Sequence, residues 1–148
     1  MENTLKVPDR INITRSAREL LKKIDDDTKY FCLHDSITSR SELFAFAMAI
    51  GADTVPMKLE NTYPGGLILD SSIEIRTKAL MYALFINKLN GDDIDEISKK
   101  DAVYTMAQEY ANTGFGIIEG YMKEKKDTDL LWVLFEELDC QFQREIGL

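Results

Sequence analysis

The segment Ser39–Gly51 constrains the fold of this chain more than any other. Ser39 is followed three residues later by Glu42, and this spacing predicts a capping box at a helix N-terminus. Gly51 suits the left-handed position just past a helix C-terminus. Every residue from 43 to 50 is apolar, and a helix that is apolar all round has to be enclosed by its neighbours. We therefore expect this segment to be the buried central helix.

Helical spacing recurs on both sides of the central segment. Thr14 is the expected N-cap of a helix to about Lys29, with one apolar face formed by Ala17, Leu20, Leu21 and Ile24. A second capping box, Ser71 with Glu74, predicts a helix to about Leu89.

Three more helices are expected in the rest of the chain. A short one starts at Asp92 or Asp93, and the next starts at Asp101 and continues to about 122, with a kink or break at 112–114. Its apolar stripe comprises Val103, Met106, Ala107, Tyr110, Phe115, Ile118 and Met122. The last helix, 128–145, has an apolar seam of Leu131, Phe135, Leu138, Phe142 and Ile146.

Extended structure is expected at only two places. Ile11 and Ile13 alternate with Arg10 and Asn12, which predicts a short N-terminal strand. The connection 52–70 is unusually long, and it is either functional or contains secondary structure such as an extended piece at 67–69. The fold class is therefore mainly α: a single domain over 1–148, of about six helices around a buried central helix.

Composition limits the possible environments of the chain. With 148 residues, 45% of them hydrophobic, it is typical of one globular domain. It has no apolar run of about 20 residues for a membrane span, and Met1–Thr4 does not resemble the start of a signal peptide. We expect a cytoplasmic protein in which Cys32 and Cys140 are reduced and buried.

No pattern in the sequence predicts catalysis. Cys32, His34 and Asp35 lack the further ligands that a zinc site needs, so we expect no metal and no cofactor. The segment 114–120 has the spacing G-x-G-x-x-x-G and follows a helical stripe, so it is not a dinucleotide fingerprint, and we expect its glycines to allow a close helix–helix approach instead. Acidic pairs such as Asp92 and Asp93 fit helix caps better than an acid–base pair. A hydrolase or transferase would need several titratable groups gathered in one pocket. We expect a protein that is not an enzyme.

The negative charge lies near the C-terminus. Residues 92–148 carry fourteen Asp or Glu against six Lys or Arg, within a net charge of −8 for the chain. Clustered basic residues would be needed to bind nucleic acid there, so DNA is compatible only with the N-terminal part. A basic or DNA-processing protein is the expected partner, and the tentative binding surface is formed by Trp132, Glu136, Glu137 and Asp139. A packed amphipathic helix explains the same pattern equally well.

Within the N-terminal part, 1–51, residues 10–14, the helix that follows and residues 39–43 resemble the ribbon–helix–helix family of DNA-binding proteins, with a longer loop between the helices than the family has. The pattern of 71–147 predicts a helical bundle. The resemblance implies a strand that pairs across a homodimer and enters the major groove. The implied DNA-binding residues are Arg10, Asn12 and Thr14 at the bases, and Ser39 and Ser41 at a phosphate.

A second resemblance covers more of the chain. The stretches 41–51 and 103–114, the latter including Glu109-Tyr110-Ala111-Asn112, resemble small accessory proteins found beside DNA phosphorothioation (Dnd) systems. This resemblance implies a context of DNA modification and phage defence, and it brings no catalytic residues. The leading hypothesis is a non-enzymatic accessory protein that binds another protein. The alternative is a ribbon–helix–helix transcriptional regulator.

Overall fold

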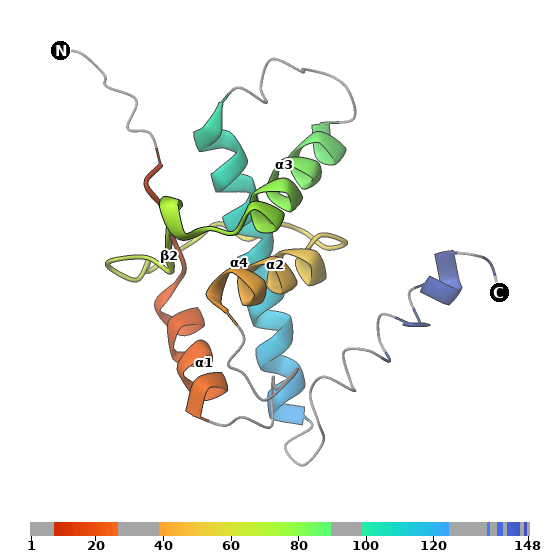
Figure 1. Ribbon diagram of the computed structural model, residues 1–148. Helices are drawn as coiled ribbons and strands as arrows, with labels where there is room; N and C mark the ends of the chain where they lie inside the picture. The colour runs from red at the N-terminus through yellow and green to blue at the C-terminus, as the bar shows by residue number, and fades with distance from the viewer. Residues whose placement is uncertain are drawn as a thin grey trace.

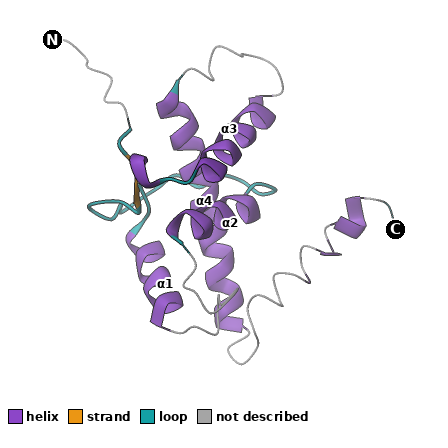
Figure 2. Ribbon diagram, in the orientation of Figure 1, coloured by secondary structure: helices purple, strands orange, loops and turns teal. Residues whose placement is uncertain are grey.

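The computed structural model describes residues 8–26, 39–89 and 99–124, together with 136, 139, 140, 142–145 and 147. The described part is mainly helical, as expected (Figures 1 and 2). Among the elements whose bounds are described, it contains four α-helices and one 3₁₀ turn, five helical elements against the six or so that we expected. In chain order these are β1 (Arg10–Ile11), α1 (Arg15–Asp26), α2 (Arg40–Gly51), β2 (Ile68–Leu69), the 3₁₀ turn η1 (Asp70–Ser72), α3 (Ile75–Leu89) and α4 (Lys100–Glu124).

One expected helix, after Asp92, falls outside the described residues. Of the helix expected over 128–145, the described residues 136, 139, 140 and 142–145 are helical, and the others are not described. Within the described residues, no helix is long and apolar enough to cross a membrane.

The centre of the fold is α4, and not the segment expected from the sequence. α4 has 25 residues, and α1, α2 and α3 all pack against it (Figure 1). Its predicted apolar stripe is buried, apart from Met106, which is half-buried. α2 packs more extensively on α4 than any other helix does, but only through one side: Phe44 and Ala47 are fully buried, whereas Ala49 is exposed. The expectation that this helix is enclosed all round was therefore wrong.

Small residues allow α2 and α4 to approach closely. A Cβ atom on Gly114 of α4 would overlap the carbonyl group of Ala47, and one on Gly51 would overlap the carbonyl oxygen of Tyr110. Gly51 is thus the last residue of α2 and not its left-handed cap, since the C-cap is Ala52 in a right-handed conformation. α4 also passes through 112–114 without interruption. Both glycines serve close packing, and neither one ends a helix.

The caps of α1 and α2 are as predicted. The Oγ1 atom of Thr14 accepts a hydrogen bond from the Ala17 N–H at 3.1 Å, and Ala17, Leu20, Leu21 and Ile24 are buried. Ser39 and Glu42 form the reciprocal capping box.

The second predicted capping box was wrong. Ser71 lies in η1, and α3 begins only at Ile75. The side chain that serves the start of α3 comes from another helix, because the Ser41 Oγ atom accepts a hydrogen bond from the Glu74 N–H at 3.0 Å. This tertiary contact replaces the expected local cap.

The connection 52–70 contains the extended piece that its length suggested. β2 pairs antiparallel with β1, with Arg10 opposite Leu69 and Ile11 opposite Ile68. The pairing extends to an isolated bridge between Thr14 and Thr62. Earlier in the chain, the connection is bound to α4 by two hydrogen bonds. The Asn112 Nδ2 atom donates to the Met57 carbonyl at 3.1 Å, and the Thr113 Oγ1 atom donates to the Val55 carbonyl at 2.7 Å. The connection therefore links the N-terminal strand to the central helix.

Candidate functional site

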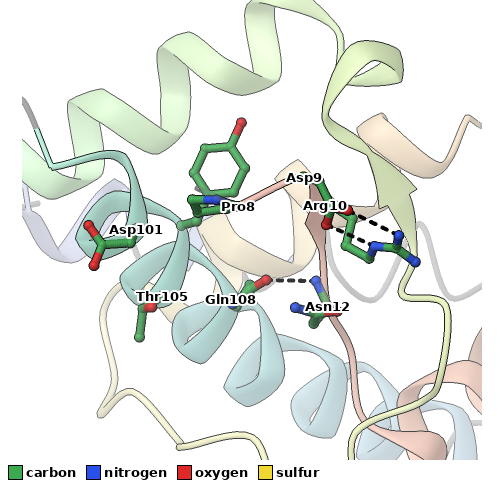
Figure 3. A pocket seen from close by; sticks show the side chains of 8 residues that line it. Pro8, Asp9, Arg10, Asn12, Asp101, Thr105 and Gln108 are labelled. Atoms are coloured by element: carbon green, nitrogen blue, oxygen red, sulfur yellow. Dashed lines mark hydrogen bonds and ion pairs between the residues drawn. The ribbon is translucent and has the colours of Figure 1, made fainter. Parts of the chain in front are cut away.

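A polar pocket of about 360 Å³ lies between the N-terminal strand and the start of α4 (Figure 3). Its wall on the strand side consists of Pro8, Asp9, Arg10 and Asn12, and its wall on the helix side consists of Asp101, Tyr104, Thr105 and Gln108. The four helix residues have the spacing i, i+3, i+4, i+7, which places them on one face of α4. This spacing and the N-terminal strand are both visible in the sequence, but the packing of the strand across this face of α4 is not.

A hydrogen bond joins the strand side of the pocket to the helix side. The Asn12 N–H donates to Gln108 Oε1 at 2.6 Å, as the dashed line between these residues in Figure 3 shows. This bond uses the edge of the strand that faces α4. On the other edge, the carbonyl of Ile11 accepts from the Leu67 N–H at 2.8 Å. Both edges of the strand thus have partners within the chain.

The guanidinium of Arg10 points away from the Asp101 side of the pocket (Figure 3). Its Nε atom lies 3.0 Å from Asp9 Oδ1, and its Nη1 atom donates to the Gly65 carbonyl at 3.1 Å. The hydrogen bond with Asp9 raises the pKa of Arg10, so the group stays charged. The other polar groups that line the pocket include the side chains of Asn12, Asp101 and Thr105 and the Nε2 atom of Gln108. Their carboxylate, hydroxyl and amide groups are suited to hydrogen bonding.

Next to this pocket, Asp70 joins three elements of the fold. Its carboxylate accepts a hydrogen bond from the Tyr104 hydroxyl, and it lies 3.1 Å from Lys100 Nζ and 3.6 Å from Lys78 Nζ. The Tyr104 hydrogen bond, followed by Lys100 and Lys78, lowers the pKa of Asp70 despite its partial burial. Burial and the same carboxylate raise the pKa of Tyr104. The cluster keeps Asp70 ionised and ties η1 to α3 and α4.

The residues implied by the ribbon–helix–helix resemblance have other partners here. Thr14 is buried and caps α1, so it does not lie on an outward face with Arg10 and Asn12. Ser41 is buried as well, and its hydroxyl oxygen accepts a hydrogen bond from the Glu74 N–H. Ser39 caps α2, and its hydroxyl also donates to Glu74 Oε1 at 3.1 Å. The strand pairs with β2 of its own chain, where the motif needs a second subunit.

Of the tentative partner-binding residues, Glu136 and Asp139 are exposed, and Trp132 and Glu137 lie outside the described residues. Cys140 is a free thiol and is exposed, so the expectation that it is buried was wrong. Cys32, His34 and Asp35 lie outside the described ranges, as do Asp92 and Asp93. Among the residues that are described, no group of three or more His, Cys, Asp or Glu could hold a metal ion.

Comparison of this chain with models of protein families, with curated proteins and with solved structures found no match.

Proposed function

We propose that this protein is a non-enzymatic accessory protein that binds a basic protein partner. The observation that carries the proposal is the exposure of acidic side chains near the C-terminus, where Glu136, Asp139 and Glu145 all lie at the surface. They belong to the part of the chain that holds most of its excess negative charge. A surface of one charge sign accelerates association with a partner of opposite sign and disfavours other partners.

The interactions of the polar groups support a binding role over a catalytic one. Arg10 is engaged by Asp9 and Gly65, and Asp70 by Tyr104 and two lysines. These titratable groups hold segments of the fold together. A catalytic site would need such groups to be available to a substrate.

The context of DNA modification and phage defence comes from the resemblance to Dnd accessory proteins. Its two stretches, 41–51 and 103–114, lie on α2 and α4, which pack directly against each other. Each stretch provides one side of the same close helix contact, through Ala47 and Gly114. The two parts of the resemblance thus form a single structural feature.

The test is a binding titration of the full chain with purified proteins of a DNA phosphorothioation system. The triple variant Glu136→Gln, Glu137→Gln, Asp139→Asn should bind the partner more weakly, and added salt should reduce the difference because it screens exposed charges. The matched control Glu19→Gln, Asp53→Asn, Glu60→Gln removes the same charge from exposed positions elsewhere. An equal loss in both variants, or a loss in neither, would contradict the proposal.

A further inference from the structure

The polar pocket between the N-terminal strand and α4 has the size of a site for a small molecule. Its volume of about 360 Å³ lies near the lower end of the range for such sites, roughly 300–1,000 Å³. This space suits a ligand no larger than a single sugar ring with its substituents. Tyr104 lines the pocket but is only 2% exposed, so it offers little aromatic surface on which a flat base could stack. Polar contacts therefore have to hold the ligand.

One carboxylate sets the charge that the ligand should carry. The charged side chains that line the pocket are Asp9, Arg10 and Asp101. Arg10 lies 3.0 Å from Asp9, so these two charges offset each other. Asp101 stands on the opposite side of the pocket from the Arg10 guanidinium (Figure 3), and within the part of the chain that the structure describes its side chain forms no ion pair or hydrogen bond. The lining thus carries one uncompensated negative charge, which favours a cationic group beside Asp101.

The neutral polar groups of the pocket suit hydroxyl groups on the same ligand. Gln108 uses its Oε1 atom to accept from the Asn12 N–H at 2.6 Å, so the Nε2 donor is the atom of this amide that remains. The Asn12 amide and the Thr105 hydroxyl can each donate and accept. Asp101, Thr105 and Gln108 follow one another along one face of α4 over about 10 Å. Neighbouring hydroxyl groups on a ring also donate and accept, and they can bind successive side chains along such a face.

We propose that this pocket binds a small hydroxylated amine of the size of an amino sugar. Its ammonium group lies at the Asp101 carboxylate, and its hydroxyl groups lie against Thr105, Asn12 and Gln108. The bound ligand joins the N-terminal strand to α4, in addition to the hydrogen bond between Asn12 and Gln108. The inference stands apart from the proposed protein partner, because it concerns another part of the chain and is tested on the isolated protein.

The test is a titration of the isotopically labelled full chain with glucosamine, followed by nuclear magnetic resonance of its amide groups. The resonances of the Asn12 N–H and the Gln108 side-chain amide should shift and then saturate, because both groups belong to the pocket. Glucose is the matched ligand, with the same ring and a hydroxyl in place of the ammonium group. It should bind about tenfold more weakly, since it gives up the hydrogen bond between two charged groups.

Two substitutions in the pocket separate the contributions of charge and hydroxyl. Asp101→Asn should abolish the preference for glucosamine over glucose, whereas Thr105→Val should weaken the binding of both and keep the preference. Both positions are exposed, so the substitutions leave the core intact, which circular dichroism checks. Glu109→Gln is the matched control, because it removes the same charge next to Gln108 on α4 but does not line the pocket. It should bind both sugars as the wild type does.

Three results would overturn the proposal. The first is the absence of a saturating shift with glucosamine at Asn12 and Gln108. The second is an equal affinity of the wild-type protein for glucosamine and glucose, which would show that Asp101 does not select a cation. The third is an equal loss of the preference in Asp101→Asn and Glu109→Gln, because the amine would then respond to the overall negative charge of the chain and not to the pocket.

Discussion

Gly114 lies directly against the backbone of Ala47, so close that an added Cβ atom would lie 2.9 Å from the Ala47 Cα and overlap its carbonyl group. The neighbouring atoms are backbone, which cannot move aside as the end of a side chain can. The contact therefore fixes how closely α2 and α4 pack, and it explains why small residues occupy both sides of the interface.

We expect Gly114→Ala to lower the free energy of unfolding by about 3 kcal/mol, or to prevent folding, because the two helices must separate to admit the methyl group. Gly116→Ala is the matched control on the same helix, where an added Cβ atom meets nothing within 4 Å. That substitution should stabilise the protein by roughly 0.5–1 kcal/mol, since alanine favours a helix over glycine. Urea unfolding of both variants measures the difference, and equal effects would contradict the close contact.

The second prediction concerns Asp70 and pH. The folded state lowers the pKa of Asp70 from 3.8, so the ionised group stabilises the fold above the pKa of the unfolded chain. This contribution is lost as the pH falls through the folded-state pKa. Asp70→Asn should thus be less stable than the wild type near neutral pH, and the gap should close in acid. Unfolding curves at a series of pH values test this.

Tyr104→Phe provides the control for that experiment. It removes the hydroxyl that is the main cause of the lowered Asp70 pKa and leaves the two lysines in place. The stability gap of Asp70→Asn should therefore be smaller near neutral pH in a Tyr104→Phe background, and it should finish closing at a higher pH. A gap that does not depend on pH in either background would show that Asp70 does not act through its charge.

A third prediction follows from the side-chain cap that α2 supplies to α3. Ser41→Ala removes the buried hydroxyl that accepts from the Glu74 N–H, and it should cost roughly 1 kcal/mol of stability. Ser72→Ala, at an exposed position in η1, should have little effect. Thermal unfolding compares the two variants. Equal midpoints would mean that the start of α3 does not depend on α2.

The fourth prediction is that duplex DNA leaves the solution mass of the protein unchanged at low and at moderate salt. Both edges of the N-terminal strand have partners within the chain, through Gln108 on one edge and Leu67 on the other. A complex that weakens steeply with salt and is reduced by Arg10→Ala and Asn12→Ala would contradict this expectation and support the regulator hypothesis.

Local signals in the sequence predicted local structure well. Thr14 and Ser39 cap helices through residues three positions away, so short patterns were sufficient to find them. Gly51 was misassigned as a helix cap, because the same residue type serves a helix end or a close approach, and only tertiary packing distinguishes the two. The break expected at 112–114 was also wrong, whereas the close helix–helix approach expected of the glycines in 114–120 is confirmed at Gly114 and not at Gly116 or Gly120. Mainly helical character followed from periodicity, but the identity of the central helix did not.

The polar features were harder to predict for the same reason. Lys100 and Tyr104 are four residues apart on one helix, but Asp70 lies 34 positions before Tyr104, and nothing in the sequence connects them. The pocket likewise joins residues 96 positions apart, Asn12 and Gln108. Such sites depend on topology, which periodicity does not specify.

The pairing of β1 with β2 has a consequence for the order in which the chain can fold during synthesis. The carbonyls of Asp9 and Ile11 find their partners in the N–H groups of Asp70 and Leu67, so the first strand has to wait until the middle of the chain has left the ribosome. Closing that loop carries an entropic cost before the strand gains its contacts. The N-terminal strand is thus translated well before the segment that completes its hydrogen bonds.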